Sequence, residues 1–403
     1  MRYSSSAVLI AAICGCSIET DFAAPSASQS VLAATTYQVA KLPSLGGMLS
    51  RGLAINDRGT VAGWSNRADG TRHAALWQSG AITDLLTLGG PSSTVAWPGL
   101  NDQGTVAGIS QTAEIDPLNE DWSCEAGGFL PSGTNLICRG FVWSQGAMRE
   151  LPTLGGNHGF AAGINDEGQV VGWAETPVHD PTCTGVQVLQ FRAVVWDVKK
   201  NKIKARELVP LSGDSTSAAT AINDRGEAVG ISGDCDQAVG RFSARHAVLW
   251  GKNGKVTEIP NLGGVTWHTP MDISAAGDVV GFSNPAGPGD PEGEFIAHAF
   301  LWKRGSAAAV DLGTLPGDTL SEAFAINARG QVVGVSFGGS NGSRAFLWQD
   351  GVMTNLNDLV PTGTLDVLLS AQDINDDGKI TGRLRDGATG ETLAFVATPN
   401  GCH

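Results

Sequence analysis

The segment DINDDGKI, residues 373–380, is the best candidate for an ion site in the sequence. It matches the opening of a calcium-binding loop, in which carboxylate and amide oxygens at alternating positions surround the ion. Asp373, Asn375 and Asp377 would be its ligands. The twelfth position is Leu384, where calcium needs a bidentate acid, and the same turn elsewhere in the chain lacks the full ligand set. We therefore predict no resident metal ion and no other cofactor.

The histidines indicate structure rather than catalysis. His73, His246 and His298 occupy one repeated position in the segments HAALW, HAVLW and HAFLW, and Arg344 fills it in another copy. The other histidines are scattered without an HExxH pattern, and the sequence has no GxSxG elbow, phosphate-binding loop or dinucleotide fingerprint. Acidic residues occur mainly in turns, where Asp is common in any case. The sequence therefore predicts that this protein is not an enzyme.

Four of the seven cysteines are candidates for disulfide bonds. Cys124 and Cys138 bracket one long insertion, and Cys183 and Cys235 lie in corresponding loops of neighbouring repeats. In an oxidising compartment we expect each of these pairs to form a bridge. Cys402 is left over, and the absence of a CxxC pair argues against structural zinc.

Residues 1–34 have the layout of a bacterial secretion signal followed by a linker. Arg2 supplies a positive charge, residues 7–13 (AVLIAAI) form a short apolar core, and a Ser- and Ala-rich stretch follows. Residues 13–16 (ICGC) also form an imperfect lipoprotein box, which makes Cys16 a candidate for lipidation. We favour ordinary secretion over lipid anchoring, and we expect an extracellular or cell-surface location in the bacterial envelope.

The charge of the chain excludes some partners. Its net charge of −14 repels phosphate backbones, so we expect no nucleic-acid partner. After the N-terminal segment, no stretch has the ~18 apolar residues needed to cross a bilayer. Membrane attachment would therefore depend on Cys16. We expect the protein to be a monomer.

The elements that must position these residues come from a repeat. A turn-and-strand segment of the type Ala-Ile-Asn-Asp-x-Gly-x-Val-Val-Gly occurs seven times, at residues 54–63, 99–108, 163–172, 221–230, 272–281, 325–334 and 373–382. A strand ending in an aromatic residue follows each copy, at Trp77, Trp143, Trp196, Trp250, Trp302, Trp348 and, in a degenerate form, Ala397. A Leu-Gly-Gly link often precedes the next copy. Both motifs give seven repeats.

Each repeat resolves into four short strands, as in the blade of a propeller. We predict an all-β protein, a seven-bladed β-propeller of four-stranded antiparallel blades over residues 37–398, with a tail at 399–403. The last repeat stops after its third strand, while residues 37–42 (YQVAKL) form an orphan fourth strand at the start of the mature chain. We therefore expect this N-terminal strand to pair with the last blade and close the ring, which leaves no unpaired edge between the two ends.

Length variation among the repeats falls mainly between the second and third strands. These loops and the Leu-Gly-Gly links should open on one face, which we predict to be the recognition face. Its candidate binding residues are Trp97, Trp122, His158, Trp267 and His268. Exposed Trp side chains suit contacts with sugars or proteins. We favour the simpler interpretation that these residues cap the ring, because pocket residues cannot be identified without geometry.

The combination of Ile-Asn-x-x-Gly-x-Val-Val-Gly, Leu-Gly-Gly and the triplet His298-Ala299-Phe300 resembles the bacterial HAF family of probable extracellular repeat proteins. The resemblance extends from Tyr37 to Thr398 and implies an exported repeat protein with no established activity. We expect an exported scaffold that binds a protein or a carbohydrate through the variable loops. The alternatives are a propeller lyase or hydrolase that acts at the channel mouth, and an envelope protein that binds no ligand.

Overall fold

Each Asn-x-x-Gly segment forms a tight hairpin turn. In the first copy, the backbone N–H of Asn56 donates to the carbonyl of Thr60 at 3.0 Å, and the N–H of Gly59 donates to the carbonyl of Asn56 at 2.9 Å. The Asn56 side-chain oxygen accepts the N–H of Thr60 in return. Gly59 has a φ of 75°, which glycine adopts without steric strain. Asn recurs in this turn because its side chain accepts a backbone N–H within the turn, and Gly recurs because it permits the positive φ.

The computed structural model describes residues 35–401 except 121–129, 131–132, 184, 201, 237–239 and 288–293. Its elements are β-strands and a short 3₁₀ helix, η2 (Leu356–Leu359). No helix in this described part is long and apolar enough to span a membrane.

The strands fall into sets of four that follow the repeats. The first strands of the sets are β2 (Gly46–Ile55), β6 (Gly89–Leu100), β10 (Gly159–Ile164), β14 (Thr216–Ile222), β18 (Thr269–Ile273), β22 (Leu320–Ile326) and β26 (Val367–Ile374). The second strands are β3 (Val61–Arg67), β7 (Val106–Ile115), β11 (Gln169–His179), β15 (Ala228–Gly233), β19 (Val279–Ser283), β23 (Val332–Phe337) and β27 (Ile380–Arg385).

The third and fourth strands complete the sets. The third strands are β4 (Arg72–Gln78), β8 (Leu136–Ser144), β12 (Leu189–Lys199), β16 (His246–Trp250), β20 (His298–Trp302), β24 (Arg344–Gln349) and β28 (Thr392–Pro399). The fourth strands are β5 (Ala81–Asp84), β9 (Ala147–Glu150), β13 (Lys202–Leu208), β17 (Val256–Ile259), β21 (Val310–Gly313), β25 (Val352–Asn355) and, from the start of the chain, β1 (Tyr37–Lys41).

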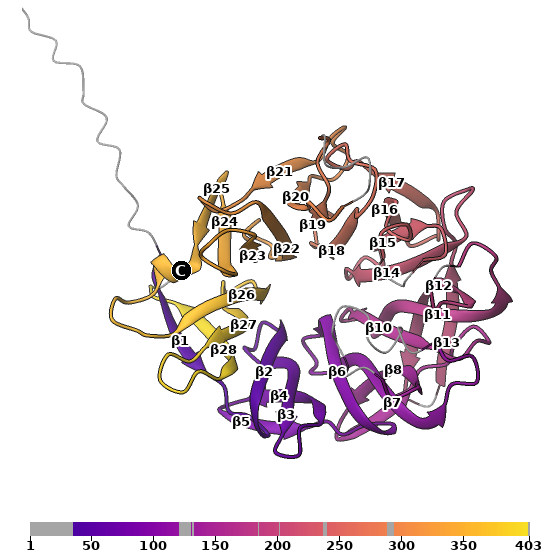
Figure 1. Cartoon of the computed structure of the whole chain (residues 1–403), viewed down its shortest axis with the longest axis horizontal. Coiled ribbons are helices and arrows are strands. Elements are labelled where there is room, and N and C mark those ends of the chain that lie inside the picture. The colour runs from indigo at the N-terminus through magenta and orange to yellow at the C-terminus, as the bar shows by residue number, and fades with distance from the viewer. Residues whose placement is uncertain are drawn as a thin grey trace, which may run out of the picture. The chain divides into compact units, whose positions relative to one another are not determined.

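The sets pack as the blades of a propeller. Five of them are separate four-stranded antiparallel sheets. The other two, β26–β28 with β1 and β2–β5, share one eight-stranded sheet because a single parallel residue pair, Leu49 with Thr392, joins β2 to β28. Figure 1 shows the sets side by side around a central opening, with the first strand of each set innermost. The end that carries the Asn-x-x-Gly turns is here called the turn face, and the end with the links and second-to-third-strand loops is called the loop face.

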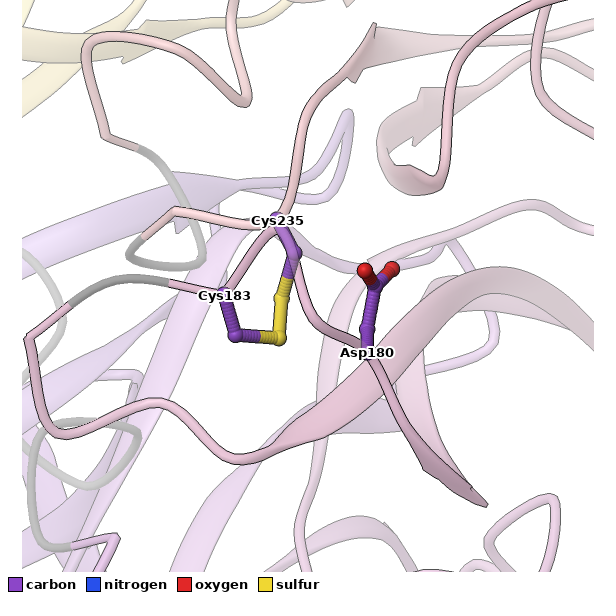
Figure 2. A group of neighbouring side chains, drawn as sticks. All are labelled: Asp180, Cys183 and Cys235. Atoms are coloured by element: carbon purple, nitrogen blue, oxygen red, sulfur yellow. A yellow bond between two sulfur atoms is a disulfide. The ribbon is translucent and has the colours of Figure 1, made fainter.

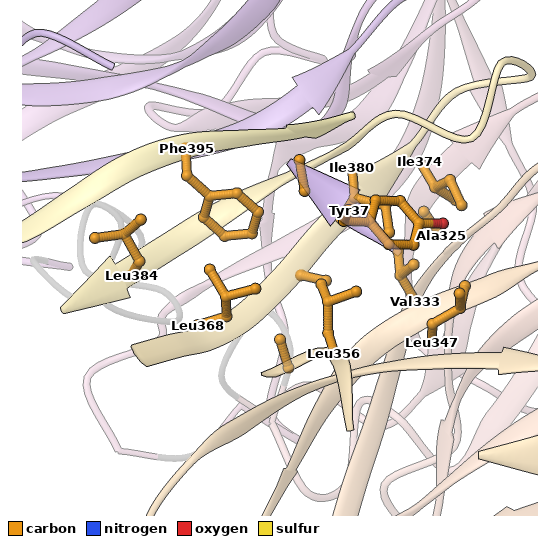
Figure 3. Close-up of a cluster of buried hydrophobic side chains, with 13 residues drawn as sticks. Tyr37, Ala325, Val333, Leu347, Leu356, Leu368, Ile374, Ile380, Leu384 and Phe395 are labelled. Carbon is orange, nitrogen blue, oxygen red and sulfur yellow. The ribbon is translucent and has the colours of Figure 1, made fainter. Parts of the chain in front are cut away.

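The N-terminal strand pairs with the last set, as the sequence predicts. β1 runs antiparallel to β28, with Tyr37 opposite Pro399 and Lys41 opposite Phe395. The Tyr37 ring is only 1% exposed and packs in a core cluster with Leu356 and Phe395 (Figure 3). Strands from the two ends of the described chain therefore share one hydrophobic core.

In three sets, the recurring Trp near the end of the third strand connects the set to the link before it. The indole N–H donates to a backbone carbonyl in that link, from Trp77 to Pro43, from Trp196 to Pro152 and from Trp250 to Val209, at 2.7, 2.8 and 2.7 Å. These three Trp side chains are buried, so the bond satisfies the polar end of a ring whose remainder fills the core.

Candidate functional site

A buried polar cluster lies under the long loops of the loop face. It consists of Asp116, Glu120, His158 and Glu175 and is here called the acidic knot. Each of these side chains is at most 2% exposed. Asp116 and Glu120 follow the end of β7, His158 precedes β10, and Glu175 lies in β11. The knot therefore joins the loop of the second set to the third set.

Hydrogen bonds from backbone amides hold all three knot carboxylates, and those to the two glutamates connect separate segments. One oxygen of Glu120 accepts the N–H groups of Val188 and Leu189, at 2.6 and 2.7 Å. One oxygen of Glu175 accepts the N–H groups of Asn157 and His158, at 3.0 and 2.8 Å. Glu120 thus ties the loop after β7 to the start of β12, and Glu175 fixes the link into β10.

The hydrogen bond at Nδ1 fixes the tautomer of the His158 ring. Its Nδ1 accepts the backbone N–H of Cys138 at 3.1 Å, so the single proton of the neutral ring must lie on Nε2. Nε2 lies 3.4 Å from the Asp116 carboxylate. A metal at Nε2 would need the ring to lose this proton, and a proton on Nδ1 would face another N–H donor. Asp116, Glu120 and His158 have the spacing of a metal site, but the histidine is in the wrong tautomer for one.

Burial has opposite outcomes for two acids of the knot. Burial disfavours ionisation of Asp116, but hydrogen bonds with His158 and from the Glu120 amide outweigh it and hold its pKa at about 2. Burial dominates at Glu175 and, with the nearby Glu120 charge, raises its pKa to about 7. None of these groups reaches the surface of the described structure, so the knot organises the loops.

A disulfide links two long loops of the same face. Cys183, between β11 and β12, is bonded to Cys235, between β15 and β16, as the sequence predicts (Figure 2). Asp180 lies beside this bridge and accepts hydrogen bonds from the Thr182 N–H and hydroxyl. Cysteines in a disulfide offer no thiolate, so these three residues are not a metal site despite their proximity. Cys124 lies outside the described residues, so its pairing with Cys138 stays a prediction.

Among the predicted binding residues of the loop face, the described structure places the two histidines in the interior. His158 and His268 are buried, and the two His268 ring nitrogens lie 2.8 Å from the Ser283 hydroxyl and 3.0 Å from the Gly264 carbonyl. Trp267 is partly exposed and packs edge-on against Phe295. Trp122, the Trp97 side chain and the lipidation candidate Cys16 lie outside the described residues. The two histidines therefore pack within the described structure and support the loops.

The calcium ligands weighed from the sequence do not converge. Asp373 accepts the backbone N–H groups of Ile55 and Ile374. The Asn375 side chain is engaged within the turn and across to the neighbouring turn, and Asp377 is paired with Lys379 at 3.3 Å. The side-chain oxygens of Asp373, Asn375 and Asp377 each interact with a different group, so the segment 373–380 acts as a structural turn.

The repeated histidine slot has a common partner in the fourth strand. His73 lies 2.8 Å from Asp84, His246 3.0 Å from Glu258, and His298 2.9 Å from Asp311. The hydrogen bond to Asp311 raises the pKa of His298. Each pair joins the third strand to the fourth, which confirms a structural role for this position.

The turn face carries a chain of hydrogen bonds between successive repeats. The side-chain amide of each turn Asn donates to the backbone carbonyl of the turn residue in the next repeat: Asn56 to Asn101, Asn101 to Asn165, Asn165 to Asn223, Asn223 to Ser274, Asn327 to Asn375, and Asn375 to Asn56. Ser274 has no amide group, so this side-chain bond is missing between the fifth and sixth turns. The Asn position thus staples neighbouring sets as well as its own turn.

A ring of Asp carboxylates surrounds the mouth of a cavity on this face. The cavity, about 230 Å³, is lined by turns of all seven repeats. Each carboxylate accepts a backbone N–H from a neighbouring turn, as Asp102 does from Asp57 at 3.0 Å. Burial and the charges of Asp376 and Asp102 raise the pKa of Asp57. The carboxylates serve as structural staples and leave the mouth negatively charged.

Comparisons with known proteins give structural likeness only. No family model matches the chain, and no curated protein matches it. The fold is similar to that of a streptogramin B lyase, with 12% identity over 91% of this chain and 98% of the other and a TM-score of 0.46. It is also similar to an acylaminoacyl peptidase from Pyrococcus horikoshii, with 10% identity over 87% of this chain and 52% of the other and a TM-score of 0.47. A third similar structure is the β-propeller domain of the Trilobed protease from Pyrococcus furiosus, with 9% identity over 75% of this chain and 82% of the other and a TM-score of 0.41.

Proposed function

We propose that this protein is an exported scaffold that binds another protein through its loop face. The observation that carries this proposal is the position of the large hydrophobic side chains that the described structure leaves exposed. Ten of these twelve lie in links, loops or strand ends of the loop face: Met48, Leu49, Leu86, Ile115, Val178, Val186, Val209, Phe242, Val265 and Leu365. The other two, Val310 and Val352, begin outer strands at the opposite end.

Exposed apolar residues gathered on one face are typical of protein interaction surfaces. Nine of the ten are aliphatic, which suits a protein partner better than the flat aromatic platform on which a sugar stacks. The long loops are also held in place, because the acidic knot and the Cys183–Cys235 bridge anchor them. Loops ordered before binding lose less entropy when a partner docks. The disulfide also agrees with an exported address.

The experiment is affinity capture from culture supernatant with three forms of the full chain. The first is the wild type, the second carries Ile115→Asp and Val178→Asp, and the third carries Val310→Asp and Val352→Asp as a matched control on the other end. We expect the wild type and the control to retain the same partner protein and the loop-face variant to lose it. Equal capture by all three forms, or no specific capture by the wild type, would contradict the proposal.

A further inference from the structure

The innermost strands of three neighbouring sets differ from the rest of the repeat. The first strand of each set places one residue opposite a fixed partner in the second strand. In three sets these pairs are Phe160 with Trp173, Ala218 with Ile231, and Thr269 with Phe282. The second-strand partner is apolar in six sets, and the seventh set has Arg383 there instead, opposite Ser370.

Two neighbouring sets change the first-strand position as well. β2 has Arg51, opposite Trp64, and β22 has Glu322, opposite Val335. Gln372 lies two residues after Ser370 in β26. The innermost strands β22, β26 and β2 are adjacent in Figure 1, so these substitutions gather on one side of the central opening.

Within the described part of the chain, several polar atoms of this group have no hydrogen-bond partner. They are Nε of Arg51 and Arg383, the hydroxyl of Ser370, and both polar atoms of the Gln372 amide. Ser370 and Gln372 are each 1% exposed, whereas both arginines keep partial exposure. Buried polar groups in native proteins nearly always have a hydrogen-bond partner, so these unsatisfied donors and acceptors are available to a ligand.

The charges in this group are unbalanced toward positive. Glu322 is the carboxylate that acts on both arginines, yet within the described residues neither guanidinium is in an ion pair with it. Burial lowers the pKa of Arg51 to about 9, and the charge of Arg383 adds to this effect. A third guanidinium, that of Arg72, is held 3.9 Å above the Trp64 ring. In a protein with a net charge of −14, an interior cluster of guanidinium groups requires an explanation.

We propose that Arg51, Arg383, Gln372 and Ser370 form a binding site for a small oxyanion, such as a carboxylate, phosphate or sulfate group. Guanidinium groups bind such anions through paired charge-assisted hydrogen bonds. The Gln372 amide and the Ser370 hydroxyl supply further donors beside them. The first-strand residues of the site lie three to five residues before the turn Asn, toward the loop face. It does not depend on the proposed protein-binding function.

Glu322 should weaken anion binding at this site, whereas the two arginines should strengthen it. Its carboxylate repels an incoming anion when it is ionised, and burial raises its pKa to about 7. Replacing it with Gln removes the repulsion and keeps the shape of the side chain. If these residues were purely structural, replacing Glu322 and replacing the arginines would not change anion affinity in opposite directions.

The test is isothermal titration calorimetry of the full chain with succinate, inorganic phosphate and sulfate. The substitutions are taken from another repeat, in which Ile231 occupies the position of Arg383 and Ala218 that of Arg51. We expect the wild type to bind at least one probe and Arg383→Ile and Arg51→Ala to weaken binding about tenfold or more. Glu322→Gln should strengthen it, and the exposed Arg385→Ala is the matched control that should leave it unchanged.

The comparison among the three probes shows which oxyanion the site prefers. Circular dichroism and denaturant unfolding establish that each variant is folded. The proposal is overturned if the wild type binds none of the probes, if Arg383→Ile and Arg385→Ala behave alike, or if Glu322→Gln weakens binding.

Discussion

The side-chain amide of Asn375 donates a 2.9 Å hydrogen bond to the backbone carbonyl of Asn56, which lies 319 residues earlier in the chain. It is the same bond that connects neighbouring turns elsewhere on the turn face. Here it links the last repeat to the first. The β1–β28 pairing makes a second link between the ends of the chain. Both links join the two ends of the described chain.

Replacing Asn375 with Ala should destabilise the whole propeller. The change removes the bond to Asn56 and leaves the Lys379 N–H, which Asn375 accepts at 2.8 Å, without its partner. Asn375 is buried, so we expect a loss of about 2 kcal/mol in the free energy of unfolding, measured by denaturant titration. Asp377→Ala, at an exposed residue of the same turn, is the control and should change little.

Replacing Ser274 with Asn should have the opposite effect. Ser274 accepts the Asp278 N–H as the turn Asn does, but it has no amide to donate to Asn327. The variant can supply the missing bond between the fifth and sixth turns. We expect a gain of about 1 kcal/mol in the free energy of unfolding. A loss of stability would show that Ser274 is required by its local packing.

Stability should fall as the pH rises from about 5 to 8. Burial raises the pKa of Asp373 to about 8, with Asp272 adding to the effect, and burial raises that of Glu175 to about 7. The unfolded chain releases these protons near pH 4, whereas the folded chain retains them, so each increase in pH through this window favours unfolding. Denaturant titrations at pH 5 and pH 8 measure the difference.

Asp373→Asn tests this origin of the pH dependence. The amide oxygen can still accept the Ile55 and Ile374 N–H groups, but the side chain no longer ionises. The decline in stability toward pH 8 should therefore be smaller in the variant than in the wild type. An identical decline would assign the pH dependence to other groups.

Removing the Cys183–Cys235 bridge should loosen the loop face. The bond closes a segment of 52 residues, and bridges of this kind stabilise proteins by about 2–4 kcal/mol. The double variant Cys183→Ser, Cys235→Ser should unfold at lower denaturant concentration than the oxidised wild type. Equal midpoints would show that the knot and the sheets hold these loops without it.

Much of the fold could be predicted from the sequence because the repeat is local. The Asn-x-x-Gly turn and the strand ending in Trp each report on a few neighbouring residues, and their recurrence gives the order of the strands. The offset between the two ends of the chain also predicted that Tyr37 and its neighbours pair with the last set. These features rest on backbone hydrogen bonds and on side-chain alternation, which a sequence displays directly.

The knot could not be predicted in the same way. Asp116, Glu120 and Glu175 lie in or beside long insertions that follow no period, and only packing brings them to His158. The proposed oxyanion site did leave a signal in the sequence, which the repeat analysis did not use. A comparison of the repeats position by position shows Arg383 where other repeats have Ile231, Phe282 and Val335. A charged residue at a repeat position that is otherwise apolar indicates a functional site.

Deletion of residues 37–42, followed by hydrogen exchange across the whole chain, tests the joining of the two ends most directly. Gln38→Ala, at an exposed position of β1, is the control and should behave as the wild type. We predict that the deletion lowers protection in β2 and β26 as well as in β28, together with a single cooperative unfolding transition at lower denaturant. Faster exchange confined to β28, with the other strands unchanged, would contradict it.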